Sequence, residues 1–222
     1  MFKHLSFDFD GVLARGSNEA YVDCFLQAFN DVGAKLSNEI ARKKIIEYWG
    51  LPVPEFTQKI LGDEPEKIPE AIRLFDLARR SPAFLAQVSL FDGAAETLRQ
   101  LKTDYSLSIV SGADRALILS VLGPELASLF TSIHAAPEYP IDQQKPAPYM
   151  LEEALRLAGA QPNEAAYIGD APNDLRMALA AQVTPVAILT GHLTRQSAAT
   201  LGAAVIINDI RDFPEAILNR YE

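Results

Sequence analysis

Hydrophobic and polar positions follow two different patterns along the chain. Between residues 18 and 87, apolar side chains recur at a spacing of three or four, which is typical of helices that bury one face. The clearest stripe runs from Tyr21 to Val32. Further helices are expected after Ser37, which is a suitable N-cap, and at 55–61 and 70–79. We therefore expect this segment to be entirely helical.

The remainder of the chain alternates short apolar runs with helical patterns. Such alternation is typical of an α/β domain with a doubly wound, Rossmann-like parallel sheet. Because an apolar run at 5–7 precedes the helical segment, that segment is predicted to be an insertion. We expect an α/β core domain of residues 1–15 and 88–222, and an alpha-helical domain of residues 16–87. The expected strands of the core are 5–7, 107–110, 132–135, 166–168, 186–189 and 204–207, and its expected helices are 115–122, 148–158, 175–181, 195–201 and 213–218.

The overall composition narrows the range of functions. With 49% hydrophobic residues the 222-residue chain can form a substantial core, and its net charge of -9 argues against nucleic-acid binding, which needs a clustered basic surface. The single cysteine, Cys24, excludes an internal disulfide. The first residues carry charge where a signal peptide is apolar, and no uncharged apolar run approaches the length of a membrane span. We expect a cytoplasmic protein that binds no membrane and is a monomer or homodimer.

Polar side chains follow several of the expected strands. Asp8 and Asp10 come directly after the run at 5–7, where the period of two in a strand predicts that both point to the same side. Since the carboxyl ends of parallel strands meet at one edge of a sheet, such groups are expected to converge. Each also has an ordinary explanation as a turn, a helix N-cap or a solvated lysine, so the argument depends on their combination. The other groups are Ser111 and Gly112 after the strand at 107–110, Asp170 and Asp174 after the strand at 166–168, and Lys145 before the helix at 148–158.

The residue types in these groups, and their order along the chain, resemble the motifs of the haloacid-dehalogenase (HAD) superfamily of phosphotransferases. The likeness extends from Phe7 to the carboxyl terminus. The helical insertion resembles the alpha-helical cap of the branch that contains phosphoglycolate phosphatase and β-phosphoglucomutase. Four motifs carry the resemblance: Phe7-Asp8-Phe9-Asp10-Gly11-Val12-Leu13, Val110-Ser111-Gly112, Lys145-Pro146-Ala147-Pro148 and Gly169-Asp170-Ala171-Pro172-Asn173-Asp174.

The resemblance implies covalent catalysis by two carboxylates. Asp8 would be the nucleophile that attacks phosphorus and forms an aspartyl-phosphate. Asp10 would protonate the leaving oxygen and then deprotonate the water that hydrolyses the intermediate. An acid at position 10 favours phosphate-ester chemistry over the carbon–halogen cleavage of other members.

The resemblance also implies a cofactor and a phosphate site. Mg2+ would be held by Asp8, the main-chain carbonyl of Asp10 and Asp170, with Asp174 behind these ligands or bound through water. The phosphate oxygens would be bound by Lys145, the Ser111 hydroxyl, and the backbone N–H groups of Gly11 and Gly112.

Substrate choice is expected to depend on the cap and its entrance. Arg15 stands where an acidic run is usual, and Trp49-Gly50 resembles a cap loop that reaches the active site. Alternatively, Arg15 faces water and Trp49 packs in the helical core. The implied function is a Mg2+-dependent, phosphoglycolate phosphatase-like enzyme acting on a small phosphorylated metabolite. A phosphomutase shares every core motif and remains open, whereas Asp10 disfavours a dehalogenase and the complete motifs disfavour a non-catalytic binding protein.

Overall fold

The computed structural model describes residues 2–49 and 51–218 and divides into two compact units. One unit runs as far as Arg15 and resumes at Ser89, and the other is Gly16–Val88. The first is built on a sheet and the second consists of helices.

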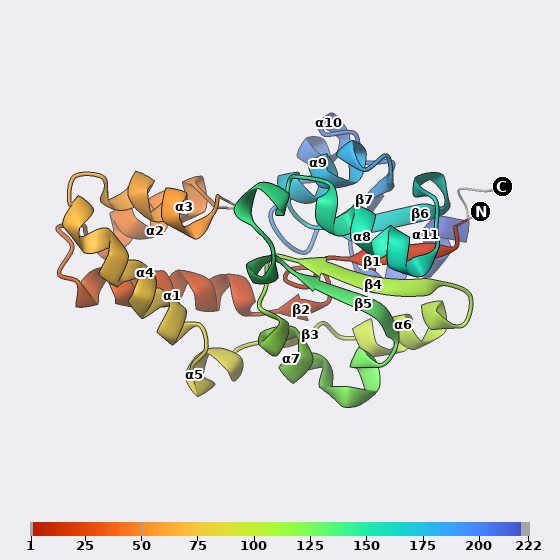
Figure 1. The fold of residues 1–222 in the computed structure, drawn as a ribbon, viewed down its shortest axis with the longest axis horizontal. Helices are drawn as coiled ribbons and strands as arrows, with labels where there is room; N and C mark the ends of the chain where they lie inside the picture. Colours follow the sequence, from red (N-terminus) through yellow and green to blue (C-terminus); the bar gives the residue numbers. More distant parts are fainter. Residues whose placement is uncertain (1, 50, 219–222) are drawn as a thin grey trace. The chain divides into compact units, whose positions relative to one another are not determined.

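The α/β unit is built on a six-stranded parallel sheet in the order β5-β4-β1-β6-β7-β8, which confirms the predicted fold class (Figure 1). From β1 the chain adds strands first on one side and then on the other. The crevice of such a sheet therefore lies at the carboxyl end of β1, between β4 and β6. The strands are β1 (His4–Phe7), β4 (Ser106–Ser111), β5 (Phe130–Ala135), β6 (Ala165–Gly169), β7 (Thr184–Ile188) and β8 (Val205–Ile207).

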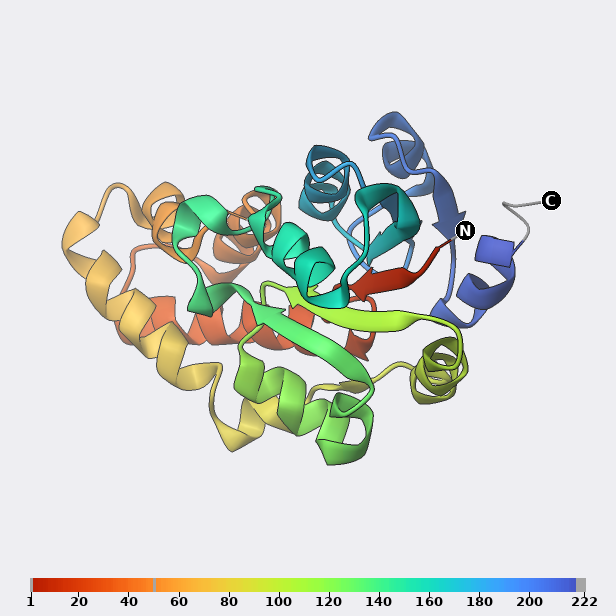
Figure 2. The ribbon, with the colours of Figure 1, turned by 45° about the vertical axis from the view of Figure 1, so that its right-hand side comes forward.

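Helices cover both faces of this sheet. On one face α8 and α9 pack against the central strands, and on the other Phe213 of α11 meets Phe7 of β1 edge-on with ring centroids 5.9 Å apart. Figure 2 shows α8 on one side of the strands and α6 and α7 on the other. The helices are α6 (Ala94–Lys102), α7 (Arg115–Ala127), α8 (Tyr149–Ala158), α9 (Pro172–Ala180), α10 (Arg195–Thr200) and α11 (Phe213–Leu218), with 3-10 turns η2 (Ala136–Glu138), η3 (Ile141–Gln143), η4 (Pro162–Glu164) and η5 (Ile210–Asp212).

Several elements of this unit differ from the sequence-based expectation. The short antiparallel pair β2 (Ala14–Arg15) and β3 (Ser89–Leu90) was not predicted, because two residues are too few to show a period. The helix α6 was also missed, since small or polar residues occupy part of its buried stripe. The helix α7 was expected to cover residues 115–122, but it continues to Ala127 beyond Gly123, whose backbone angles are not helical.

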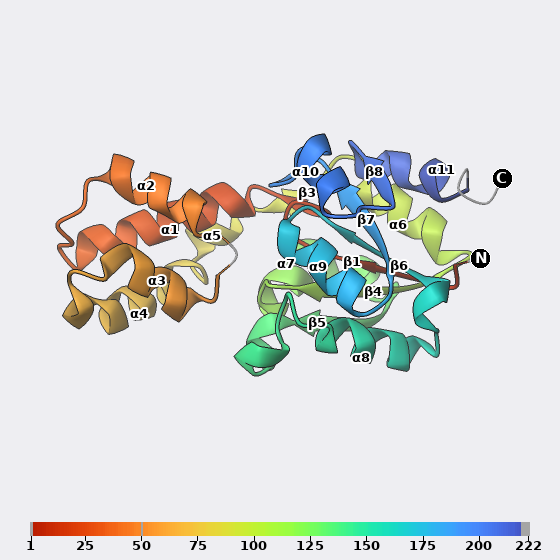
Figure 3. The same cartoon turned by 90° about the horizontal axis from the view of Figure 1, so that it is seen from above.

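The described part of the helical unit consists of five α-helices and a 3-10 turn, whose arrangement Figure 3 shows. Aromatic side chains lie in its core. Phe25 stacks on Phe75 with ring centroids 3.7 Å apart and lies 4.5 Å from the ring of Phe56. Ser37 caps the second helix as expected, because its hydroxyl accepts from the Ile40 N–H. The helices are α1 (Ser17–Asp31), α2 (Asn38–Glu47), α3 (Val53–Leu61), α4 (Ile68–Ala78) and α5 (Pro82–Leu85), with the 3-10 turn η1 (Pro65–Lys67).

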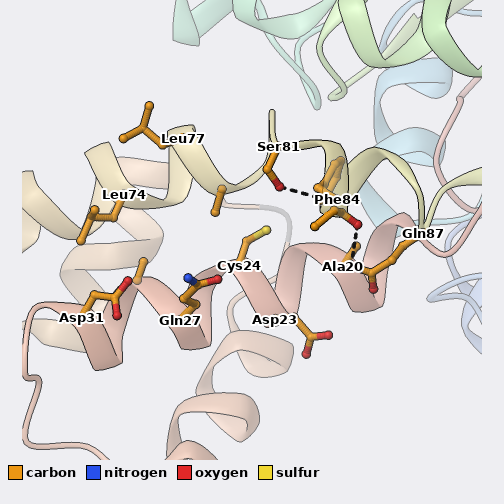
Figure 4. Close-up of a pocket in the computed structure, with 13 residues that line it drawn as sticks. Ala20, Asp23, Cys24, Gln27, Asp31, Leu74, Leu77, Ser81, Phe84 and Gln87 are labelled. Carbon is orange, nitrogen blue, oxygen red and sulfur yellow. Dashed lines mark hydrogen bonds between the residues drawn. The ribbon is translucent and has the colours of Figure 1, made fainter.

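A groove of about 440 Å³ lies in this unit between α1 and the α4–α5 segment (Figure 4). Its lining includes Cys24, Leu74 and Phe84. Burial raises the pKa of the Cys24 thiol to about 11, so the thiol stays protonated at neutral pH. Cys24 therefore packs in the helical unit as a buried, neutral thiol.

Candidate active site

Asp8 stands where β1 ends, at the carboxyl edge of the sheet. The strand stops at Phe7, and the Asp8 N–H donates to the Ile168 carbonyl of the neighbouring β6 at 2.9 Å. The alternation of side chains along a strand predicted that Asp8 and Asp10 point to the same side of the sheet, but the strand ends before both residues. Asp10 is therefore positioned by the turn that follows and not by strand periodicity.

Three buried carboxylates converge at this edge. Asp8, Asp170 and Asp174 each offer an oxygen, and these oxygens all lie within 4.8 Å of one another. The Lys145 ammonium reaches into the same space, 3.0 Å from Oδ2 of Asp8 and 2.7 Å from Oδ1 of Asp174. The structure thus brings together four predicted site residues that come from three different sequence motifs.

The protonation equilibria show how strongly these groups interact. Burial raises the pKa of Asp8 to about 6, although Lys145 and a hydrogen bond from Ser111 oppose the increase. Burial, with the nearby Asp174, also raises the pKa of Asp170 well above its usual range. For Lys145, burial alone would lower the pKa, but the two carboxylates that it contacts outweigh burial and raise it. The ammonium is therefore charged, and added positive charge would favour ionisation of the acids.

Both carboxylate oxygens of Asp174 accept hydrogen bonds from the protein. Its Oδ1 accepts from Lys145 and lies 3.1 Å from the Tyr167 hydroxyl. Its Oδ2 accepts from the backbone N–H groups of Asp170 and Ala171 at 3.1 and 3.0 Å. The same bonds cap the first turn of α9, which begins three residues earlier than expected. Asp174 therefore organises the loop between β6 and α9.

Glycines leave room for the carboxylates of Asp170 and Asp174. A Cβ atom would lie 2.2 Å from Oδ2 of Asp170 if added to Gly11, and 1.7 Å from it if added to Gly191. At Gly169 it would lie 2.2 Å from the Cβ of Asp174. Gly11 also has a φ of 72°, in the left-handed region that favours glycine. Side chains at these positions would displace the two acids.

The loop after β7 contacts the site, although its residues were not among the predicted site residues. The Thr190 hydroxyl donates to the Gly11 carbonyl, and the N–H groups of His192 and Leu193 donate to the Asp170 carbonyl at 3.0 and 2.9 Å. A signal was present in the sequence, because Thr190-Gly191 follows an expected strand as the assigned motifs do. The buried Tyr167, in contrast, looked like an ordinary strand residue.

Ser111 and Gly112 lie at the end of β4, next to β1 in the sheet. Ser111 is buried, and its hydroxyl oxygen accepts from the Ala113 N–H at 3.2 Å. Gly112 is exposed, and a Cβ atom added to it would meet no atom within 4 Å. The backbone at Gly112 is therefore open to a ligand.

The residues expected to select the substrate are not part of the carboxylate cluster. Arg15 lies on β2, where its guanidinium forms an exposed ion pair with Asp92 at 3.1 Å. Trp49 is half-buried in the helical unit, two residues beyond the end of α2. Gly50 lies outside the described residues. Their role in substrate choice stays a prediction.

The residues present fit a divalent cation. Three buried carboxylates face one ammonium group, which leaves an excess of two negative charges when all are ionised. Carboxylate oxygens are the hard ligands that Mg2+ prefers. Asp8 and Asp170 are the better placed side-chain ligands, since Asp174 is already held by four protein donors.

Comparison with known proteins agrees with this geometry. The chain is 26% identical over 217 residues to phosphoglycolate phosphatase 1 of Pseudomonas aeruginosa, covering 93% of this chain and 76% of that protein. It is 27% identical over 173 residues to the pyrophosphatase PpaX of Bacillus cereus, covering 76% and 74%. A haloacid dehalogenase-like family hydrolase from Streptococcus pneumoniae has the same fold, with a TM-score of 0.80, 20% identity, and coverage of 100% and 99%. Among the described residues, no helix is both long and apolar enough to span a membrane. The family model for haloacid dehalogenase-like hydrolases matches residues 5–188, so the chain belongs to this family.

Proposed function

We propose that this hydrolase is a phosphatase that cleaves a phosphate ester of a small metabolite through an aspartyl-phosphate on Asp8. The observation that carries the proposal is the position of the Asp8 carboxylate, which is buried beside a charged lysine and two further acids at the switch point of the sheet. The names of the relatives, phosphoglycolate phosphatase and pyrophosphatase, support a phosphate substrate.

The reaction proceeds in two displacements. A carboxylate oxygen of Asp8 forms a bond to phosphorus while the bond from phosphorus to the ester oxygen breaks. Asp10 gives its proton to the departing oxygen, so that an alcohol leaves. Asp10 then takes a proton from water, whose oxygen attacks phosphorus and releases inorganic phosphate and the Asp8 carboxylate.

Charge neutralisation is the main demand of phosphoryl transfer. Lys145 and the Ser111 hydroxyl bind phosphate oxygens in this proposal, together with the backbone N–H of the exposed residue Gly112. The N–H of Gly11, which the resemblance also implied, already donates to the Ala14 carbonyl at 2.8 Å, so we do not assign it to the phosphate. Mg2+ would be held by Asp8, Asp170 and the main-chain carbonyl of Asp10. When bound, it would withdraw electron density from the phosphate and offset the charge of the acids.

A screen of phosphate release tests the proposal. The wild type is supplied with small phosphate esters, including a sugar 1-phosphate, with Mg2+ and with EDTA. We expect release only with Mg2+, and we expect Asp8→Asn to lower it by at least about 1,000-fold because an amide is a poor nucleophile.

Asp63→Asn is the matched control, since Asp63 is an exposed residue of the helical unit. It should retain wild-type activity. Equal activity of Asp8→Asn and wild type would refute the mechanism, and isomerisation of the sugar phosphate without phosphate release would indicate a mutase.

A further inference from the structure

The phenol of Tyr167 connects the hydrophobic core to the carboxylate cluster. Tyr167 lies on β6 two residues before Gly169, and its side chain is completely buried. Its ring belongs to the apolar cluster formed with α8 and α9, which includes Leu151 and Met177. This packing holds the ring in place and directs the hydroxyl toward the site.

The hydroxyl contacts groups from separate motifs. Its single O–H group is shared between two acceptors, the Val110 carbonyl directly before Ser111 at 2.8 Å and Oδ1 of Asp174 at 3.1 Å. The same Oδ1 accepts from Lys145 at 2.7 Å. The Lys145 ammonium is 5.3 Å from the centre of the Tyr167 ring, within the range of a cation–π contact. One side chain therefore contacts the end of β4, the first turn of α9 and the phosphate-binding lysine.

These contacts constrain where the lysine can lie. Oδ1 of Asp174 receives both the ammonium and the phenol, so the phenol limits the positions open to that oxygen. The ring limits the ammonium from a second direction. A shift of either contact would move Lys145 relative to Asp8, which it also binds at 3.0 Å.

We propose that Tyr167 is a positioning residue, whose hydroxyl and ring place the Lys145 ammonium for phosphate binding by acting through Asp174. The inference rests on the phosphatase function proposed above. It assigns no proton transfer to the phenol, which remains a neutral donor because burial raises the pKa of Tyr167 well above its usual range.

The test is Tyr167→Phe, which removes the hydroxyl and keeps the ring. Loss of one hydrogen bond to a charged group should lower kcat/KM by about 5- to 30-fold. In an Asp174→Asn background the same substitution should change kcat/KM by less than about 2-fold, because Tyr167 acts through the Asp174 carboxylate. Equal losses in the two backgrounds would show a merely structural role and overturn the proposal.

A second measurement does not depend on turnover. Calorimetric titration with inorganic phosphate in the presence of Mg2+ should give a Kd that is several-fold weaker for Tyr167→Phe than for wild type. Unchanged phosphate affinity together with unchanged kcat/KM also overturns the proposal. If the wild type releases phosphate from no ester, the proposed function is wrong. If the wild type is active and Tyr167→Phe is equally active, only the role proposed for Tyr167 is wrong.

Tyr139→Phe is the matched control. Tyr139 is also in the α/β unit, and its hydroxyl bonds to Nδ1 of His134 at 2.6 Å instead of to the carboxylate cluster. Removing this hydroxyl should change kcat/KM and phosphate affinity by less than about 2-fold. A loss equal to that of Tyr167→Phe would show that the effect is not specific to the site.

Discussion

The α/β unit and the helical unit differ in where they place charge. In the described part of the helical unit, the core is apolar and aromatic, and its buried polar residues are Ser17 and Thr57. Several of its charged groups form pairs near the surface, such as Arg73 with Glu70. The α/β unit buries three carboxylates at one edge of its sheet. Because burying like charges is costly, this arrangement is explained by chemistry and not by stability.

Two lysines illustrate the difference. Lys145 has 11% of its side chain exposed and bonds to two buried carboxylates. Lys67 of the helical unit has 21% exposed and bonds to Glu64 and to the Gly33 carbonyl. Removal of Lys67 leaves partners that water can reach, whereas removal of Lys145 leaves buried acids in mutual repulsion.

The largest expected effect is on the stability of Lys145→Met. Without metal, the loss of the ammonium that contacts the buried acids should lower the free energy of unfolding by about 3 kcal/mol or more. Lys67→Met should lower the free energy of unfolding by less than roughly a quarter of that amount, because the ion pair of Lys67 with Glu64 is partly solvated. Urea unfolding of both variants in EDTA checks the comparison, and equal losses would contradict it.

A neutral buried group in the same α/β unit should produce an intermediate, pH-dependent effect. His4 is fully buried, its Nε2 lies 3.0 and 2.9 Å from the hydroxyls of Ser6 and Ser108, and burial lowers its pKa to about 4. Between pH 6.5 and 4 the unfolded chain binds a proton that the folded chain does not bind, so stability falls as the pH falls. The His4 contribution from pH 7 to pH 5 is about 2 kcal/mol.

Urea unfolding of wild type and His4→Asn at both pH values isolates this contribution. The variant should be less stable at pH 7 but should lose about 2 kcal/mol less than the wild type on acidification. The other titrating groups, including Asp8, are common to both proteins. Parallel pH dependences would show that His4 is not the source of the acid sensitivity.

The smallest expected effect is on the surface of the helical unit. Arg73 and Glu70 are more than half exposed, so water screens their attraction. Arg73→Ala should shift Tm by less than about 2 °C, as measured by scanning calorimetry. A shift comparable to that of Lys145→Met would remove the distinction between the two units.

Local patterns predicted the sheet because its strands are short apolar runs between helical segments. They also predicted that Asp8, Lys145 and Asp174 meet, since parallel strands end at one edge. They could not show that Oδ1 of Asp174 is held by Tyr167 and Lys145, because this depends on how strand β6 and the segment of Lys145, which is 29 residues away, pack around that oxygen.

Other features left little local signal of their role. The sequence around Tyr167 is that of an ordinary buried strand, and Gly191 follows an expected strand but has no neighbouring acid or lysine that would mark it as part of a site. The close approach of Gly191 to the Asp170 carboxylate becomes visible only when β6 and β7 are paired. The strands β2 and β3 are too short for periodicity, and their pairing joins residues about 75 positions apart.

That two-stranded ribbon has a consequence for the modularity of the protein. Ala14 pairs with Leu90 and Arg15 with Ser89, so the chain leaves and re-enters the α/β unit at neighbouring positions. The gap left by excising Gly16–Val88 has the geometry of a β-hairpin, which two residues such as Asn-Gly can close. Helical inserts of different length and sequence can therefore be exchanged at this point while the register of the parallel sheet is kept.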